Sequence, residues 1–388
     1  MKHFRTALFG TGFVGRVHLE AIRRLGYVQV YAIGEPQIEK ARSLAAEFGA
    51  EKVEADYRKI LEDPAVDAVH ICTPNALHFP IAQDSLQAGK HVICEKPLAT
   101  SVEEARQLAA LARRTGLRNA TFHNLRFYPM VQQMRRMCQD GDLGEILVVQ
   151  GTYSQDWLLY DTDWNWRLDS KHNGPSRCLA DIGSHWCDMA EHVTGLRIAS
   201  VCADLQTFHA TRKRPKGPIE TFAGKMLQPE DYVEVPIDTE DFGAVVFRMG
   251  ARARGAFTAS QVSAGRKNRL NIEIFGAARG VAWDQERPDE LWIGQRNAAN
   301  HVMLKDPSLL KERARPYADL PGGHSEGYDD TFKQVFRRFY KSIEDPAAEP
   351  DYPQFADGLR QLTILEAELE SHRQRRWVDV PAPQSAVA

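Results

Sequence analysis

The feature that most constrains this chain is an alternation of short apolar strands with amphipathic, helix-length segments from residue 3 to about 123. The strand-like runs are rich in β-branched residues and end at Gly, Pro or a charged turn, as buried strands do. Strands that are separated by helices run parallel, because each helix returns the chain across the sheet. The pattern predicts a doubly wound parallel sheet with strands at 6–9, 28–33, 66–71 and 91–94 and helices at 37–48 and 102–115.

A different pattern follows residue 124. Strand-like segments joined by short connections dominate it, and short connections favour antiparallel pairing. We therefore expect an α/β Rossmann domain at 1–123 and an α+β domain at 124–388 that contains an antiparallel β-sheet. In the second domain the expected helices are 129–138 and 181–194, the expected surface loop is 213–224, and the expected strands are 197–208, 231–237, 243–249, 253–262, 268–276 and 279–284.

Charge and cysteine content exclude several classes of protein. The chain has 49 Lys and Arg against 52 Asp and Glu, a net charge of −3, so no overall field attracts nucleic acid or an anionic membrane. No apolar run is long enough to span a membrane, and no export signal is recognisable at the start. Six cysteines without paired spacing predict neither disulfides nor structural zinc. We expect a cytoplasmic protein whose partners are small molecules.

A glycine-rich loop, Gly10–Gly15, links the first predicted strand to a helix. Glycines there permit a tight turn and a close approach of pyrophosphate to the helix N-terminus. Glu35 lies 20 residues beyond Gly15, where its carboxylate can bind ribose hydroxyls and repel the extra phosphate of NADP. The alternative is a turn followed by a solvated acid. The spacing predicts NAD in preference to NADP, held by Gly10, Thr11, Gly12, Phe13, Val14 and Glu35.

Two more strand ends carry polar residues, Thr73–Asn75 and Glu95–Lys96. Ligands bind beyond the carboxyl ends of strands in open α/β sheets, so both segments are expected near the cofactor. Lys96 could stabilise a developing alkoxide or polarise a carbonyl, with a surface Glu–Lys turn as the alternative. Asn75 and His78 could contact the nicotinamide side of the cofactor or cap the following helix.

A third group, Asp181, His185 and Asp188, has the spacing i, i+4 and i+7 and would share one face of the helix predicted at 181–194. A histidine beside carboxylates is suited to exchange protons with a substrate hydroxyl. Zinc is the competing chemistry, but one histidine and two carboxylates form a poor zinc set. A structural polar face is the other alternative. We expect acid–base chemistry and no metal.

These motifs together resemble the glucose-fructose oxidoreductase and inositol dehydrogenase (Gfo/Idh/MocA) superfamily over nearly the whole chain. The resemblance implies a Rossmann domain joined to an open-faced antiparallel sheet, with a last helix at about 355–376 that packs back on the Rossmann domain. It places Lys96, Asp181 and His185 on the family's catalytic positions. It also places Glu95 and Asn75 on cofactor-contact positions. The segments that carry it are Gly10–Gly15, Thr73–Asn75, Glu95–Pro97, Gly183–Asp188 and Gly323–Tyr328.

The segment 155–167 is unusually rich in tryptophan and polar residues. Aromatic faces stack on sugar rings and polar side chains bind hydroxyls, so the segment predicts a carbohydrate-contact loop. The alternative is a tryptophan-anchored loop that packs on the sheet. With the turn at 124–129, it resembles family members that act on pyranosides or anhydrosugars such as levoglucosan. The expected substrate residues are Arg126, Gln155, Trp157, Tyr160, Trp164, Trp166, Arg167, Asp181, His185 and His324.

These inferences predict an NAD-linked dehydrogenase that oxidises a secondary ring hydroxyl of a sugar, anhydrosugar, glycoside or cyclitol. Lys96, His185 and Asp181 would carry the chemistry, and the order of proton transfer between Lys96 and His185 stays open. Two alternatives from the same superfamily are an NAD-dependent glycosidase and a regulator that senses sugar or NAD without turnover. Because the exposed face of a large antiparallel sheet needs cover, we also expect a homo-oligomer, a dimer or tetramer, formed through that face.

Overall fold

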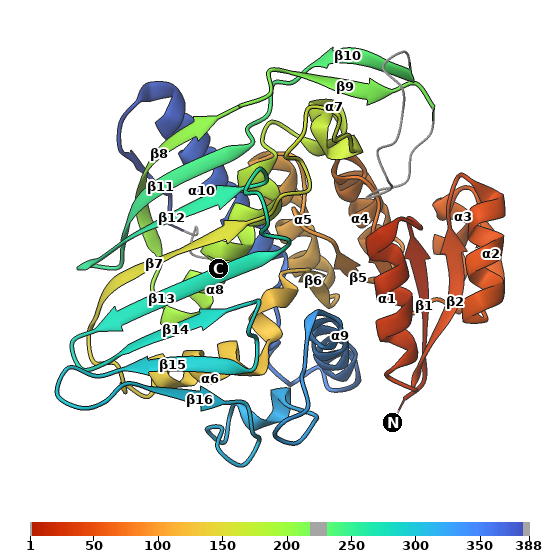
Figure 1. The fold of residues 1–388 in the computed structure, drawn as a ribbon. Coiled ribbons are helices and arrows are strands. Elements are labelled where there is room, and N and C mark those ends of the chain that lie inside the picture. The colour runs from red at the N-terminus through yellow and green to blue at the C-terminus, as the bar shows by residue number, and fades with distance from the viewer. Residues whose placement is uncertain (1, 218–230, 383–388) are drawn as a thin grey trace. The chain divides into compact units, whose positions relative to one another are not determined.

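The computed structural model describes residues 2–217 and 231–382 (Figure 1). Contacts within the chain divide it into two compact units, each made of two separate stretches. The first unit holds the chain up to Phe127 together with Tyr328–Leu362, and the second holds Tyr128–Gly327 and the chain from Thr363 onward. A late segment of the sequence therefore belongs to the N-terminal unit.

The first unit is built on a six-stranded parallel sheet in the order β3-β2-β1-β4-β5-β6. The central strands are buried on both faces, which explains their near-continuous apolar sequences. The strand order reverses between β1 and β4, so the carboxyl ends of these two strands form the topological switch point. The strands are β1 (Phe4–Phe9), β2 (Val28–Gly34), β3 (Lys52–Glu54), β4 (Ala68–Ile71), β5 (His91–Cys94) and β6 (Asn119–Thr121).

Helices connect these strands. Local signals set their ends: α5 begins after Ser101, whose side chain accepts a hydrogen bond from the backbone of Glu104, and it ends at the left-handed Gly116. The late helix α9 packs beside α1, where Arg24 pairs with Asp330 at 2.5 Å. The helices of this unit are α1 (Phe13–Arg23), α2 (Ile38–Phe48), α3 (Tyr57–Leu61), α4 (His78–Gln87), α5 (Val102–Thr115), α9 (Tyr328–Glu344) and the first part of α10 (Phe355–Gln374).

The second unit is built on a nine-stranded sheet in the order β16-β15-β14-β13-β7-β12-β11-β8-β17. Its neighbouring strands run antiparallel except β7 and β12, which run parallel. A separate two-stranded sheet pairs β9 (Thr211–Pro215) with β10 (Tyr232–Pro236). The strands of the large sheet are β7 (Ile146–Ser154), β8 (Ile198–Gln206), β11 (Phe242–Met249), β12 (Ala253–Ser260), β13 (Arg269–Gly276), β14 (Gly280–Asp284), β15 (Glu290–Gly294), β16 (His301–Leu304) and β17 (Val378–Asp379).

One face of the large sheet is covered by α6 (Pro129–Gln139) and α8 (Ser184–Thr194), which lie behind the sheet in Figure 1. Trp186 of α8 stacks on Phe257, with ring centroids 4.6 Å apart. On the opposite face, side chains alternate with the buried ones and remain half-buried or exposed. Val246 and Val302 on that face are 49% and 50% exposed.

The predicted fold class is confirmed, and most predicted helices and strands match the observed ones within two residues. Two predictions were wrong in part. Lys213–Pro215 belong to strand β9, because they pair with β10, whereas residues 218–224 of the predicted surface loop lie outside the described residues. The helix predicted at 181–194 begins at Ser184, because Leu179–Gly183 form a π-helical turn whose i→i+5 bonds change the register of Asp181.

Candidate functional site

The glycine loop after β1 has little room for side chains at two positions. Gly10 has a φ of +92°, and a Cβ added there would lie 2.6 Å from the carbonyl oxygen of Cys72. A Cβ on Gly15 would lie 2.2 Å from the carbonyl oxygen of Gly10. These contacts explain why both positions are glycine: the first lets the β1 and β4 loops touch, and the second lets α1 pack on its own entry loop.

Gly12 differs from these two glycines, because a Cβ added there would meet nothing within 4 Å. It is the N-cap of α1, and no side chain caps the helix. The positive end of the α1 dipole therefore lies beside a position with open space around it. Phe13, the first residue of α1, is 56% exposed. This cradle has the chemistry that binds a diphosphate.

Glu35 follows β2 and reaches the glycine loop. Its Oε2 accepts hydrogen bonds from the backbone N–H of Thr11 at 3.1 Å and from Thr11 Oγ1 at 2.7 Å. Its Oε1 accepts from the backbone of Gln37 at 3.1 Å. The carboxylate is thus fixed at the sheet edge beside the diphosphate cradle, as ribose recognition requires. The residues present fit an NAD dinucleotide.

The loops after β4 and β5 are tied together by His78. Its Nδ1 lies 2.7 Å from the carbonyl oxygen of Pro97, and its Nε2 lies 2.9 Å from that of Thr73. His78 is 1% exposed, and burial lowers its pKa. A neutral His78 donates to one of these carbonyls and packs between the two loops. Lys96, at the same sheet edge, is only partly buried. Its predicted contact with the cofactor stays a prediction.

Glu95 and Asn75 are also at this edge and are 9% and 6% exposed. Oε2 of Glu95 accepts a hydrogen bond from the backbone N–H of Lys96 at 3.2 Å. The structure therefore gathers the glycine loop, Glu35, the Thr73–Asn75 segment and Lys96 along one edge of one sheet, as the sequence predicts.

Arg126 belongs to the first unit, apart in sequence from the other expected substrate residues. Its Nη2 lies 3.0 Å from Oδ1 of Asp357 on α10, and it is 8% exposed. Burial would raise the pKa of Asp357, but the charge and hydrogen bond of Arg126, together with the backbone N–H of Gln354, hold that pKa below its usual value. Arg126 thus anchors α10 to this unit, and its predicted substrate contact stays a prediction.

In the second unit, Asp181 lies in the π-helical turn before α8. Gln261 Nε2 donates a hydrogen bond to Asp181 Oδ2 at 2.9 Å. Arg167 Nε lies 3.7 Å from the other carboxylate oxygen. His185 follows in the first turn of α8 and is 7% exposed. Both predicted catalytic residues of this unit therefore come from one short segment of chain.

Gln261 is itself held by a buried network of ions. Arg177 Nη1 donates to Gln261 Oε1 at 2.9 Å, and Arg177 also pairs with Asp241. Arg212 pairs with the same carboxylate at 2.7 Å, and all three charged side chains are fully buried. Burial would raise the pKa of Asp241, but the two guanidinium groups hold it below its usual value. One carboxylate between two cations keeps each of them paired.

Arg212 extends this network to the aromatic loop. Its Nη1 donates to the carbonyl oxygen of Tyr160 at 2.7 Å, and its Nη2 donates to that of Leu158 at 2.9 Å. The loop backbone and Asp181 are therefore held by one continuous set of buried hydrogen bonds. Sequence reasoning missed this set, because Arg177, Arg212 and Asp241 stand in polar, loop-like stretches of sequence where no local pattern marks them for burial.

The aromatic loop has a packed part and an open part. Trp157 and Trp164 pack against a buried cluster of Leu158, Leu168 and Ile237, as a structural loop would. Other side chains are more open. Tyr160 is 63% exposed, and the guanidinium of Arg167 lies over the Trp166 ring at 4.5 Å. Gln155 donates to Asn268 at 2.8 Å and accepts from the indole of Trp157 at 2.8 Å.

His324 is exposed, and its Nδ1 lies 3.2 Å from the carbonyl oxygen of Gly322. Its own carbonyl oxygen accepts from Lys305, which pairs with Glu326 at 2.8 Å. The Lys305–Glu326 pair is buried, so it fixes the Gly323–Tyr328 segment. A role for the His324 side chain in substrate binding stays a prediction.

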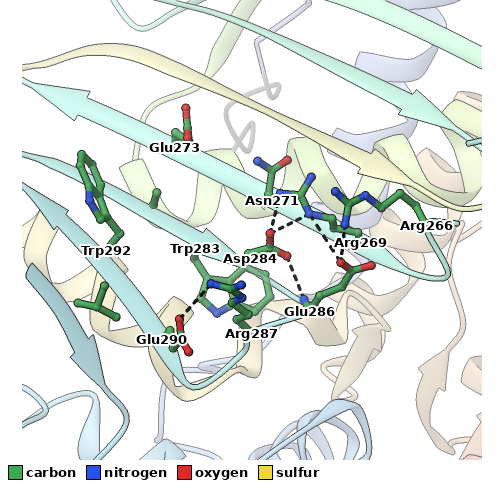
Figure 2. Close-up of a pocket in the computed structure, with 12 residues that line it drawn as sticks. Arg266, Arg269, Asn271, Glu273, Trp283, Asp284, Glu286, Arg287, Glu290 and Trp292 are labelled. Atoms are coloured by element: carbon green, nitrogen blue, oxygen red, sulfur yellow. Dashed lines mark hydrogen bonds and ion pairs between the residues drawn. The ribbon is translucent and has the colours of Figure 1, made fainter.

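A pocket of about 610 Å³ lies on the half-exposed face of the large sheet, over β13–β15 (Figure 2). Ion pairs line it: Arg269 lies 2.6 Å from Asp284, and Arg266 lies 2.8 Å from Glu286. Trp292 stands at its other end. None of the twelve residues that line it is a predicted site residue. Its arginines are already paired with carboxylates, so the pocket resembles a mixed-charge surface more than a binding site for an anion.

Within the residues that the structure describes, no group of three or more His, Cys, Asp or Glu side chains is arranged to hold a metal ion. No helix in the same residues is both long and apolar enough to cross a membrane. The six cysteines are all free thiols.

Comparison with known proteins extends these observations. A family model described as "Oxidoreductase family, NAD-binding Rossmann fold" matches residues 4–123, and one described as "GFO/IDH/MocA C-terminal domain" matches residues 131–281. A levoglucosan dehydrogenase from Pseudarthrobacter phenanthrenivorans is 30% identical over 395 residues, which cover 98% of this chain and 99% of that protein.

Solved structures of NAD-binding dehydrogenases are also similar to this chain. A levoglucosan dehydrogenase in complex with NADH and L-sorbose has a TM-score of 0.88 and 29% identity, covering 98% of this chain and all of that one. An inositol dehydrogenase homolog from Azotobacter vinelandii, complexed with NAD+, has a TM-score of 0.84 and 25% identity, with 97% of each chain covered.

Proposed function

Because the chain belongs to the GFO/IDH/MocA oxidoreductase family, we propose that it oxidises a secondary ring hydroxyl of a sugar or cyclitol to a ketone. The substrate class includes anhydrosugars and glycosides, and NAD is the cofactor. The observation that carries the proposal is the continuity of three loops at one sheet edge. Gly10 touches Cys72, and His78 joins Thr73 to Pro97, so Lys96 belongs to the same edge as the diphosphate cradle.

Each residue has a role that follows from its chemistry. When bound, NAD supplies the hydride acceptor. The Lys96 ammonium stabilises the negative charge that develops on the substrate oxygen. His185 accepts the hydroxyl proton, and Asp181, restrained by Gln261 and Arg167, orients the hydroxyl. Glu35 selects NAD, because its carboxylate would face the added phosphate of NADP.

The aromatic loop supplies the substrate wall in this proposal. Tyr160 and Trp166 offer aromatic surface for a sugar ring, and Arg167 and Gln155 offer donors for hydroxyls. Its backbone is held by Arg212, so the loop can present these groups in a fixed arrangement. A rigid wall of this kind favours a ring substrate over a flexible chain.

The exposed face of the large sheet forms a homo-oligomer interface in the same proposal. The exposed valines of this face, Val246 on β11 and Val302 on β16, support it, because a second copy would cover them. A second copy is the expected occupant, as a dimer or tetramer. We assign the enzyme to the cytoplasm, since six free thiols suit a reducing compartment.

A substrate screen tests the proposed activity. Purified protein is incubated with NAD and a panel that contains levoglucosan, myo-inositol, free aldoses and aryl glycosides, and NADH absorbance is followed. Dehydrogenation gives NADH in proportion to ketone. Release of the aglycone without NADH accumulation would instead identify an NAD-dependent glycosidase. NAD binding with no turnover on any sugar or glycoside in the panel would favour a sensor.

A further inference from the structure

Four side chains form a continuous chain of hydrogen bonds through the core of the first unit. His18 of α1 lies 3.1 Å from Oε1 of Glu95 through its Nε2, and 3.0 Å from Nδ1 of His70 through its own Nδ1. His70 of β4 continues from its Nε2 to the hydroxyl of Tyr340 on α9, at 2.8 Å. We call this set of four residues the Glu95–Tyr340 chain. Both ring nitrogens of both histidines are used.

The chain is buried. His18, His70 and Tyr340 are fully inaccessible to solvent. Phenylalanine rings surround them, and the ring of Phe336 lies 4.9 Å from that of His18. Burial lowers the pKa of His70 and raises that of Tyr340, so both side chains are neutral at physiological pH. A neutral imidazole donates from one nitrogen and accepts at the other.

One tautomeric order satisfies every link. The carboxylate of Glu95 only accepts hydrogen bonds, so His18 donates to it from Nε2 and accepts at Nδ1. His70 must then donate from its Nδ1, which leaves its Nε2 to accept the phenol hydrogen of Tyr340. Every hydrogen in the chain points toward Glu95. The opposite order needs a doubly protonated His18, which would place an extra charge among aromatic rings.

We propose that His18, His70 and Tyr340 are positioning residues that lock the Glu95 carboxylate in one orientation and, through it, the backbone of Lys96. Glu95 uses Oε1 for His18 and Oε2 for the backbone N–H of Lys96. Beyond Tyr340 the next partner is Thr6, which is also fully buried, so a proton has no exit along the chain and transport is not its purpose. The functional consequence rests on the proposed role of Lys96 at the cofactor edge.

The first test reads the tautomers and needs no substrate. Protein labelled with 15N-histidine is examined by long-range 1H–15N correlation at pH 8, with His18→Gln and His70→Asn used for assignment. The expected result is a bare Nδ1 and a protonated Nε2 on His18, with a protonated Nδ1 and a bare Nε2 on His70. A doubly protonated His18, or His70 protonated at Nε2, would overturn the proposal.

The second test asks whether the far end of the chain affects chemistry. Tyr340→Phe removes the phenol hydroxyl that donates to His70. Tyr352→Phe is its matched control, since that phenol is also buried and bonds Ser342 at 2.7 Å in the same unit. With a substrate from the screen, Tyr340→Phe should lower kcat severalfold and leave KM for NAD within about twofold. The control Tyr352→Phe should change neither kcat nor the KM for NAD.

The two tests separate two kinds of failure. Equal kcat losses in Tyr340→Phe and Tyr352→Phe would reduce the chain to ordinary core packing and overturn the positioning role. Rescue is a further readout: His18→Gln, which keeps a donor toward Glu95, should retain more activity than His18→Leu. If the tautomers are as expected but no sugar is oxidised, the hydrogen-bond order stands and the proposed function fails.

Discussion

Gln261 Nε2 donates a hydrogen bond to Asp181 Oδ2 at 2.9 Å, while Gln261 Oε1 accepts one from the buried Arg177. A single amide therefore connects a predicted catalytic carboxylate to a buried ion network. Because the amide has a donor on one side and an acceptor on the other, its orientation is determined by its neighbours. This relationship makes Gln261 a positioning residue for Asp181.

Replacement of Gln261 by Leu should lower kcat on a confirmed substrate by on the order of tenfold, because Asp181 loses its restraint and Arg177 loses an acceptor. The Kd for NADH, which depends on the first unit, should stay unchanged. Steady-state kinetics and fluorescence titration measure the two quantities. Gln285→Leu is the control, since Gln285 is a buried glutamine of the same unit whose side chain accepts a hydrogen bond from the backbone N–H of Leu270. Equal losses in both variants would contradict the assignment.

NAD should bind at least about tenfold more tightly than NADP, because the Glu35 carboxylate would face the added phosphate. Glu35→Gln removes that charge and should bring the dissociation constants of NAD and NADP closer together. Glu39→Gln removes a carboxylate from the nearby α2, where it pairs with Arg42, and should leave the ratio as it was. Isothermal titration with both cofactors gives the ratios. Equal or tighter NADP binding by the unaltered protein would refute this interpretation of Glu35.

Lys96→Ala should lower turnover by on the order of a hundredfold through lost alkoxide stabilisation, with little change in NAD affinity. Lys59→Ala serves as the control, because Lys59 is an exposed lysine of the same unit, 3.8 Å from Glu54. His185→Ala should also slow turnover and recover partly at high pH, where hydroxide can replace the missing base. Near-normal turnover in either site variant would require a different catalytic set.

Val246→Arg should shift the protein toward monomers if the exposed face of the large sheet is the oligomer interface. Burying the arginine charge in an apolar contact costs desolvation free energy, so association becomes unfavourable. Leu309 is 62% exposed and lies outside that sheet, so Leu309→Arg should not change the assembly. Multi-angle light scattering at micromolar concentration measures both masses. If the unaltered protein is a monomer in this measurement, the sheet face is not an oligomer interface.

Glu368 should make the protein less stable as pH rises. Burial raises its pKa from 4.5 to about 8, with a hydrogen bond from Cys187 at 3.8 Å opposing that rise. The folded state therefore holds a proton that the unfolded state releases, so stability falls between about pH 4.5 and 8 and levels off above. The total loss is up to about 5 kcal/mol, at about 1.4 kcal/mol per pKa unit.

Glu368→Gln removes this proton linkage. Denaturant unfolding at pH 5 and pH 8.5 should show that the stability advantage of the variant over the unaltered protein grows with pH. Glu366→Gln, which changes an exposed neighbour on α10, should show no such trend. A constant difference across this range would mean that Glu368 is already ionised in the folded protein.

The sequence alone determined the parallel sheet, the glycine loop and the position of Glu35. These depend on signals within about 35 consecutive residues: apolar periodicity, the need for glycine at a positive φ, and the spacing of one strand-helix-strand unit. The position of Lys96 could be predicted for the same reason, since a charged residue directly after a buried strand must lie at the sheet's carboxyl edge.

Tertiary structure decided the rest. Tyr340 is 270 positions from His70, and Gln261 is 80 positions from Asp181, so no local pattern relates the members of either pair. The π-helical turn at Leu179–Gly183 departs from the regular spacing that predicted one shared helical face. Buried polar groups must find partners wherever packing brings them together, and that requirement acts in space and leaves no periodic trace in the sequence.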